Sequence, residues 1–222
     1  MSEHPTVTVG TRVSTILYNR GRGVVYAVHG TPRPETVRRL AGGNIATGGN
    51  ASFDIVFACG GTSRMLPESI LHGVQWTIFH DEPKADAEEI VQLLAHAEAC
   101  RAEKQAQKER AQAAHAAEVE RLRTDPEYAL LEQGSDQSGL LAGKNIRRLL
   151  KAALPNHTFR VRKSSYGTVS ISCVDPLDDA SQKTVDDIRK RFRSGAYDLM
   201  TDSHLTHQSP WQEVFGGAEY VH

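Results

Sequence analysis

The feature that most constrains this chain is a run of forty residues, 84–123, that contains neither glycine nor proline. Twelve of them are alanine, and most of the others are Glu, Gln, Lys and Arg, which have strong helix propensity. Apolar residues recur three and four positions apart up to Cys100, and the pattern then fades into mixed charge. A helix that is polar on all sides typically crosses solvent and connects two folded domains. The run therefore predicts a long connecting helix with a folded domain on either side.

The segment before this helix, residues 6–80, predicts an all-β domain. Short apolar or alternating segments are separated by Gly and Pro, as turns between strands require. The expected strands are 12–18, 23–29, 53–58, 64–71 and 75–79, and the segment 29–52 is expected to be a long Gly-rich loop. The stretches VGTRVSTILYNRGRGVVYAV and FDIVFACGGTSRMLPESIL resemble the strands of SH3-like small barrels. This resemblance implies a closed or half-closed barrel.

The segment after the helix, residues 139–222, predicts a two-layer α-β-β-α module. Ile146, Leu149, Leu150 and Ala153 form one helical stripe, and Pro155 ends that helix. Two alternating strands follow, joined by a turn at Tyr166-Gly167. The second helix is expected to begin at Asp178, Asp179 or Ser181, to bury Val185, Ile188 and Phe192, and to stop at Gly195. The whole chain is thus expected to be α+β.

The second domain begins with an acid-free stretch, from Gln137 to Val174, in a chain whose net charge is only −1. A solvated face normally mixes both signs of charge, so the missing acid favours a binding surface for phosphate. The alternative is an ordinary polar face on an amphipathic helix. We expect the helix and hairpin cations to form one exposed wall. The candidate nucleic-acid-binding residues are Lys144, Arg147, Arg148, Lys151, Arg160, Arg162 and Lys163.

Signs of catalysis are weak. Asp198, Asp202, His204 and His207 lie within ten residues and include types that bind divalent metals, but no second cluster matches them. Cys59 precedes two glycines with no identifiable base, so a buried structural thiol is expected. Phosphate-loop and nucleophile-elbow motifs are missing from the sequence. We therefore expect no enzyme activity, no cofactor and no metal.

The stretch AGKNIRRLLKAALPNHTFRVRKSSYGTVSISCVD, followed by a helix and GAYDLMTDSH, resembles a large polyvalent protein-associated domain, the twenty-ninth of that numbered set. The residues that carry the resemblance are Ile146, Arg147, Leu150, Lys151, Pro155, Phe159, Val161, Tyr197, Asp198, Met200 and Asp202. Such domains occur in proteins of phages, plasmids and conjugative elements. Proposed roles are protection of incoming DNA and blunting of host defences. The resemblance implies no catalytic residues.

Three functions follow from these observations. The first is a non-enzymatic accessory protein of a mobile element that binds DNA or RNA phosphates. The second is an anti-defence inhibitor, against CRISPR or restriction for example, that binds a host protein. The third, ranked below both, is a metal-dependent enzyme. Apolar runs are too short to span a membrane, no secretion signal is evident and the three cysteines are scattered, so we expect a cytoplasmic protein. The long helix could also pair in a homodimer.

Overall fold

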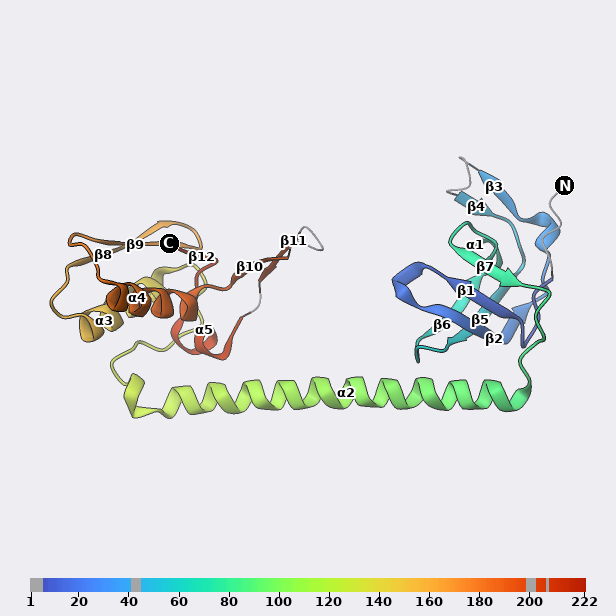
Figure 1. Cartoon of the computed structure of the whole chain (residues 1–222), viewed down its shortest axis with the longest axis horizontal. Helices are drawn as coiled ribbons and strands as arrows, with labels where there is room; N and C mark the ends of the chain where they lie inside the picture. The colour runs from blue at the N-terminus through green and yellow to red at the C-terminus, as the bar shows by residue number, and fades with distance from the viewer. Residues whose placement is uncertain (1–5, 41–44, 199–202, 207) are drawn as a thin grey trace. The chain divides into compact units, whose positions relative to one another are not determined.

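The computed structural model describes residues 6–40, 45–198, 203–206 and 208–222 (Figure 1). The chain divides into two compact units, unit 1 from residue 1 to 108 and unit 2 from 109 to 222. Within the described residues, no helix is both long and apolar enough to cross a membrane.

Unit 1 is built on a five-stranded antiparallel sheet with strand order β6-β5-β2-β1-β7. The strands are β1 (Arg12–Thr15), β2 (Gly21–Gly30), β5 (Ala51–Phe57), β6 (Thr62–Pro67) and β7 (Trp76–Phe79). Alternate residues of β5 point into the core, where Phe53, Ile55 and Phe57 are fully buried. Gly23 on β2 allows close packing, because a Cβ there would lie 2.7 Å from the carbonyl oxygen of Val56. All five strands fall within or next to the segments predicted from the sequence.

The predicted barrel is corrected by this topology, because the described strands form an open sheet in which β6 and β7 are unpaired edges. The predicted strand 64–71 stops at Pro67 and continues as the short helix α1 (Glu68–Leu71). This helix contacts both β6 and β7, and its Leu71 is fully buried in the core of unit 1. A helix therefore fills the space that barrel closure would need.

The predicted loop 29–52 is also more structured than expected. It contains the short helix η2 (Pro34–Thr36) and the paired strands β3 (Arg38–Leu40) and β4 (Ile45–Thr47). The buried carboxylate of Glu68 holds the two ends of this segment. Its Oε2 accepts hydrogen bonds from the amides of Arg33 (3.0 Å), Asn50 (2.8 Å) and Ala51 (3.2 Å). No local sequence pattern indicates this contact, because its partners are up to 35 residues apart.

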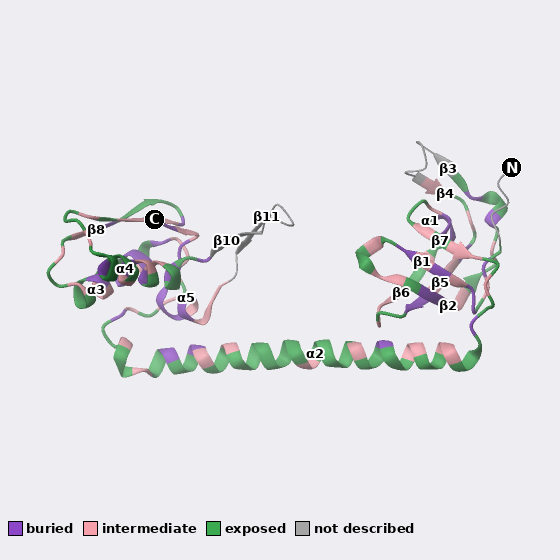
Figure 2. Cartoon of the chain, viewed as in Figure 1, coloured by how far each residue is buried: buried purple, intermediate pink, exposed green. Residues whose placement is uncertain are grey.

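The predicted long helix is α2 (Ala87–Thr124), and its middle is exposed (Figure 2). Its first part belongs to unit 1, where Glu89 accepts two hydrogen bonds from Arg12, at 2.6 and 2.7 Å. Its last part belongs to unit 2, where Val119 and Leu122 join the core. The helix thus contributes packing to each unit at its ends and little in between.

Unit 2 contains the predicted α-β-β-α order as α3 (Leu140–Ala153), β8 (Phe159–Ser165), β9 (Thr168–Cys173) and α4 (Asp179–Phe192). Asp178 caps α4, and Gly167 has the positive φ expected at the turn. Further elements are η4 (Pro126–Tyr128), β10 (Gly195–Asp198), β11 (Ser203–Thr206), α5 (Pro210–Phe215) and β12 (Tyr220–Val221). β12 joins β9 in parallel and completes a three-stranded sheet of order β12-β9-β8. Helices α3 and α4 lie on the same side of the β8–β9 hairpin (Figure 1).

Candidate nucleic-acid interface

Helix α3 begins the acid-free stretch, and it packs on the inner face of the β8–β9 hairpin. Ile146 and Leu150 are fully buried, as the stripe predicted, and Val161 of β8 is buried in the same core. The helix begins where Asp136 accepts hydrogen bonds from the amides of Leu140 and Leu141, both at 3.2 Å. A carboxylate at this position satisfies amides that have no partner within the helix. The cations of α3 lie on its solvent side.

Two of these cations share one carboxylate that comes from outside the acid-free stretch. Lys144 Nζ lies 3.2 Å from Oε2 of Glu132, and Arg148 Nη2 lies 2.6 Å from Oε1. The hydrogen bond from Lys144 and the charge of Arg148 hold the pKa of Glu132 below its usual range. This pairing leaves Lys144 and Arg148 less available to an external phosphate.

The position of Glu132 is fixed by a buried amide side chain. Asn145 is fully buried, and its Oδ1 accepts the amide of Glu132 at 2.9 Å. Its Nδ2 donates to the carbonyl oxygens of Glu132 and Phe215, both at 2.8 Å. These three bonds tie the loop before α3 to α3 itself and to α5. The carboxylate of Glu132 is therefore built against α3 by the core.

Arg147 is used in a different way. Its Nη2 donates a hydrogen bond of 2.6 Å to the carbonyl oxygen of Val161 in β8. β8 is an edge strand of the sheet, so this bond satisfies a backbone group that no neighbouring strand reaches. Lys151, the last cation of α3, is exposed and has no ion pair among the residues that the structure describes.

The hairpin cations lie on the other face of the sheet. Arg160 and Arg162 are exposed and flank the buried Val161, so alternation directs them away from α3. Their cross-strand partners are serines: Arg160 pairs with Ser172, and Arg162 pairs with Ser170. Within the described ranges, neither arginine has an ion pair.

The turn of the hairpin adds a lysine and an aromatic ring. Lys163 Nζ lies 5.5 Å from the centre of the Tyr166 ring, and this ring is 81% exposed. Ser164 and Ser170 form a hydroxyl–hydroxyl hydrogen bond of 2.6 Å. One acid is near this end, because a Cβ on Gly167 would lie 3.5 Å from that of Glu219. We define the hairpin face as Arg160, Arg162, Ser170 and Ser172, and leave out Lys163 because it lies opposite the buried Val169 and so belongs to the other side of the strand.

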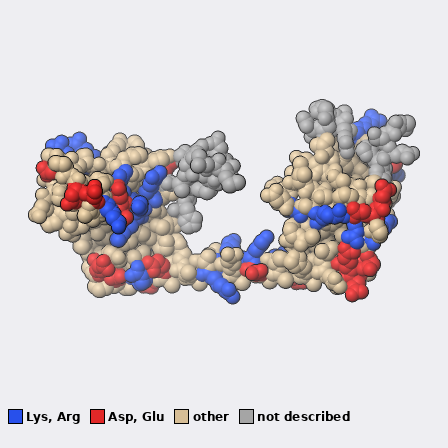
Figure 3. All heavy atoms as spheres, in the orientation of Figure 1, with Lys and Arg blue, Asp and Glu red and all other residues tan. Residues whose placement is uncertain are grey.

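The single wall of cations expected from the sequence is therefore not formed. The α3 cations lie on the helix side of unit 2, whereas Arg160 and Arg162 of β8 lie on the far face of the sheet. A stretch of sequence without Asp or Glu can still have a carboxylate next to it in the fold. Here Glu132, 12 residues before Lys144, contacts α3. Elsewhere on unit 2, cations and acids stand side by side (Figure 3), as in the pair of Arg189 and Asp186 at 2.9 Å.

The side chains of the four residues proposed to bind a metal lie outside the described part of the structure. Asp202 and His207 are not described, and for Asp198 and His204 only the backbone is, in the ladder between β10 and β11. No three His, Cys, Asp or Glu side chains in the described ranges are grouped so as to hold a metal. Cys59 is exposed and not buried as expected, because β5 ends at the buried Phe57 and the chain turns outward.

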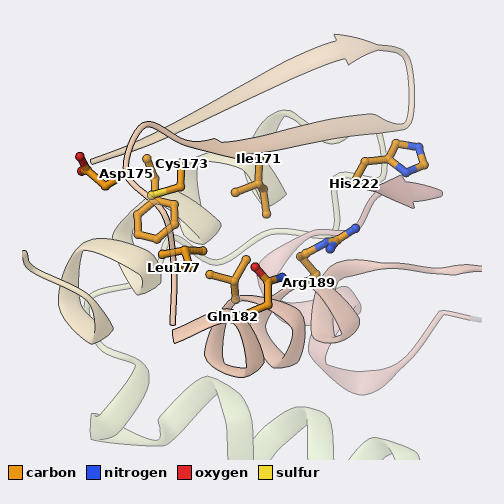
Figure 4. Close-up of a pocket in the computed structure, with 9 residues that line it drawn as sticks. Ile171, Cys173, Asp175, Leu177, Gln182, Arg189 and His222 are labelled. Atoms are coloured by element: carbon orange, nitrogen blue, oxygen red, sulfur yellow. The ribbon is translucent and has the colours of Figure 1, made fainter. Parts of the chain in front are cut away.

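A cavity of about 290 Å³ lies between the inner face of the hairpin and α4 (Figure 4). Its lining combines apolar side chains, among them Phe159, Ile171 and Leu177, with the polar Asp175, Gln182, Arg189 and His222. The cation in it, Arg189, is already hydrogen-bonded to Asp186 and, at 3.3 Å, to the carbonyl oxygen of Val221. The cavity therefore offers no unpaired cation to a phosphate.

Comparison with protein families places both units in one class, the large polyvalent protein associated domains. Residues 5–126 match Large polyvalent protein associated domain 30, and residues 137–222 match Large polyvalent protein associated domain 29. The first match covers more than half of the chain, so the chain belongs to the domain 30 family. None of the curated proteins and none of the solved structures is significantly similar to it.

These matches confirm one expectation and correct another. The C-terminal resemblance to the twenty-ninth domain is confirmed. The N-terminal region belongs to domain 30, whose match includes α2, in place of the SH3-like barrel that the sequence suggested. Domains of this class are typical of large polyvalent proteins of mobile elements.

Proposed function

We propose that this chain is a non-enzymatic accessory protein of a mobile genetic element and that it binds nucleic-acid phosphates through the hairpin face. The observation that carries the proposal is that Arg160 and Arg162 stand exposed on one sheet face without an ion pair among the described residues. Unpaired guanidinium groups form strong charge-assisted hydrogen bonds to phosphate.

The spacing of the two arginines supports a backbone contact. Residues two apart on a strand are separated by about 6.6 Å. Successive phosphates of one duplex strand are about 3.4 Å apart along the axis and are further separated by the twist of the helix, so two arginines at this spacing can contact neighbouring phosphates. Ser170 and Ser172, opposite them on β9, supply hydroxyl donors to the same groups. No exposed aromatic set accompanies them on the strands, which favours recognition of the backbone over base stacking.

The test is a binding titration of the full chain with duplex DNA, single-stranded DNA and RNA over a salt series. We expect the Arg160→Glu, Arg162→Glu double variant to lose most of the affinity and to flatten the salt dependence by about two units of slope. The matched control is Lys183→Glu with Lys190→Glu on α4, which makes the same change in net charge and should leave binding nearly intact. Arg147 and Arg148 are poor test positions because both hydrogen-bond to backbone carbonyls.

Two outcomes would contradict the proposal. One is affinity that the hairpin variant and the control variant reduce equally, which would indicate a non-specific effect of net charge. The other is no binding to any nucleic acid. In that case the alternative role, an anti-defence inhibitor that binds a host protein, would become the leading proposal, and a pull-down from host lysate would address it.

A further inference from the structure

A second group of unpaired cations lies in unit 1, at a turn that the hairpin proposal does not involve. The turn between β5 and β6 packs against α2 and forms a cavity of about 340 Å³. We call this cavity the turn pocket. Its lining residues are Gly60, Thr62, Arg101, Lys104, Gln105 and Lys108.

The close approach of turn and helix depends on glycine. Gly60 has a φ of +78°, and a Cβ on it would lie 2.6 Å from Sγ of Cys100. Any side chain there would push the turn away from α2 and open the pocket. Arg20 reaches the same turn from the sheet, because a Cβ on Gly61 would lie 4.0 Å from its Nε. The guanidinium of Arg20 also stacks over Phe57, 5.3 Å from the ring centre.

The helix contributes three cations to this one place. Arg101, Lys104 and Lys108 are separated by three and four residues, so they lie on the same face of α2. All three are exposed, and none has an ion pair within the described part of the chain. Thr62, which also lines the pocket, carries a hydroxyl that can donate to an oxyanion.

Two arginines of unit 1 do have carboxylate partners. Arg12 forms two hydrogen bonds with Glu89 on the first part of α2, and Arg22 pairs with Glu82. None of the six residues that line the turn pocket carries a carboxylate, so its cations concentrate positive charge that a ligand can neutralise.

We propose that the turn pocket binds an oligophosphate, two or three linked phosphate groups, either free or carried by a nucleotide. Three helix cations match the charge of such a chain, and lysines bind phosphate as point charges from several directions. The cavity volume of about 340 Å³ leaves room for linked phosphates. The site is independent of the hairpin face, since all its lining residues lie in unit 1.

Isothermal titration of the full chain with sodium tripolyphosphate tests the proposal, with ADP and ATP as further arms and sulfate at equal ionic strength as reference. We expect one tripolyphosphate per chain and weak or no binding of sulfate. The Lys104→Glu, Lys108→Glu variant should bind at least about tenfold more weakly, as expected for one lost charge-assisted hydrogen bond. Both lysines are exposed on a helix, so circular dichroism should show an unchanged fold. The affinity of the milder Lys104→Gln, Lys108→Gln variant for tripolyphosphate should lie between that of the unchanged protein and that of the double Glu variant.

The arms and controls separate the outcomes. Equal binding of ATP and tripolyphosphate would identify nucleotide phosphates as ligands, and binding of tripolyphosphate alone would identify a free oligophosphate. The Arg160→Glu, Arg162→Glu variant has the same change in net charge and should bind tripolyphosphate normally, so failure of the hairpin proposal would leave this one standing. Absence of binding, binding that the Lys104 and Lys108 variants do not weaken, or a requirement for a polynucleotide would overturn it.

Discussion

The acid-free stretch of unit 2 supplies cations to two elements, α3 and β8, and these elements use them differently. On α3, Lys144 and Arg148 share the carboxylate of Glu132, and Arg147 donates to a backbone carbonyl of β8. On β8, Arg160 and Arg162 have no such partners among the described residues. The same residue types, a few positions apart in sequence, thus stabilise the fold in one element and are left to solvent in the other.

The difference follows from what lies behind each element. Helix α3 is anchored in the core, where Asn145 brings the loop of Glu132 against it. On the outer face of the hairpin, none of the carboxylates in the described part of the chain forms an ion pair with Arg160 or Arg162. A cation is available for a ligand where the fold leaves it without a neighbour, and sequence spacing alone does not determine this.

The largest expected effect is on the contact that holds α3 to its acid. Asn145→Ala removes three hydrogen bonds, one buried and two partly buried, and leaves their partners unsatisfied, so it should destabilise unit 2 by about 3 kcal/mol. Urea denaturation in a Trp76→Phe background, with Trp211 as the reporter of unit 2, would measure this loss. Asn156→Ala, at an exposed position after α3, is the control and should change little. A loss no larger than that of the control would show that Asn145 does not hold the loop.

A smaller loss of stability is expected when the pH is lowered, because Asp136 stabilises the start of α3 only in its ionised form. Burial acts to raise the pKa of Asp136, but hydrogen bonds from Leu141 and Ser138 outweigh it and hold the pKa below the ordinary 3.8. A carboxyl whose pKa is lower in the folded state stabilises the fold above pH 3.8, and that contribution is lost as the pH falls through the folded pKa.

The corresponding measurement is the stability of unit 2 between pH 6 and pH 2. Asp136→Asn keeps an oxygen that can accept the same amides but does not titrate, so the stability of the variant should depend less on pH over this range. Parallel curves for the two proteins would rule out Asp136 as a contributor.

The smallest expected effect tests whether the cations of α3 take part in nucleic-acid binding together with those of the hairpin face. Glu132→Gln removes the carboxylate from Lys144 and Arg148, which lie on a different side of unit 2 from the hairpin face. At physiological salt the Debye length is about 8 Å, so nucleic-acid affinity should rise by less than about threefold. The salt slope should also be unchanged in the binding titration. A slope steeper by about one unit or more would mean that α3 is part of the interface after all.

Much of the architecture was predictable because its signals are local. Helix α2 follows from a run without glycine or proline, and α3 and α4 follow from apolar residues three and four apart. The turn at Gly167 and the cap at Asp178 are also encoded within a few residues. Three features were not predicted: the sheet is open and not a barrel, α1 is a helix, and β12 pairs in parallel with β9. Each of them depends on contacts between distant segments.

The candidate sites show the same division. The cations of the hairpin face were identified from the missing acids of residues 137–174, whereas the turn pocket was not found because its residues come from a turn and from a helix some forty positions later. By itself, the sequence determined which segments are helices, which are most of the strands and where positive charge is concentrated. Only the tertiary structure decided which cations meet a carboxylate, because Glu132 reaches α3 through the hydrogen bonds of Asn145, whereas no carboxylate among the described residues pairs with Arg160 or Arg162.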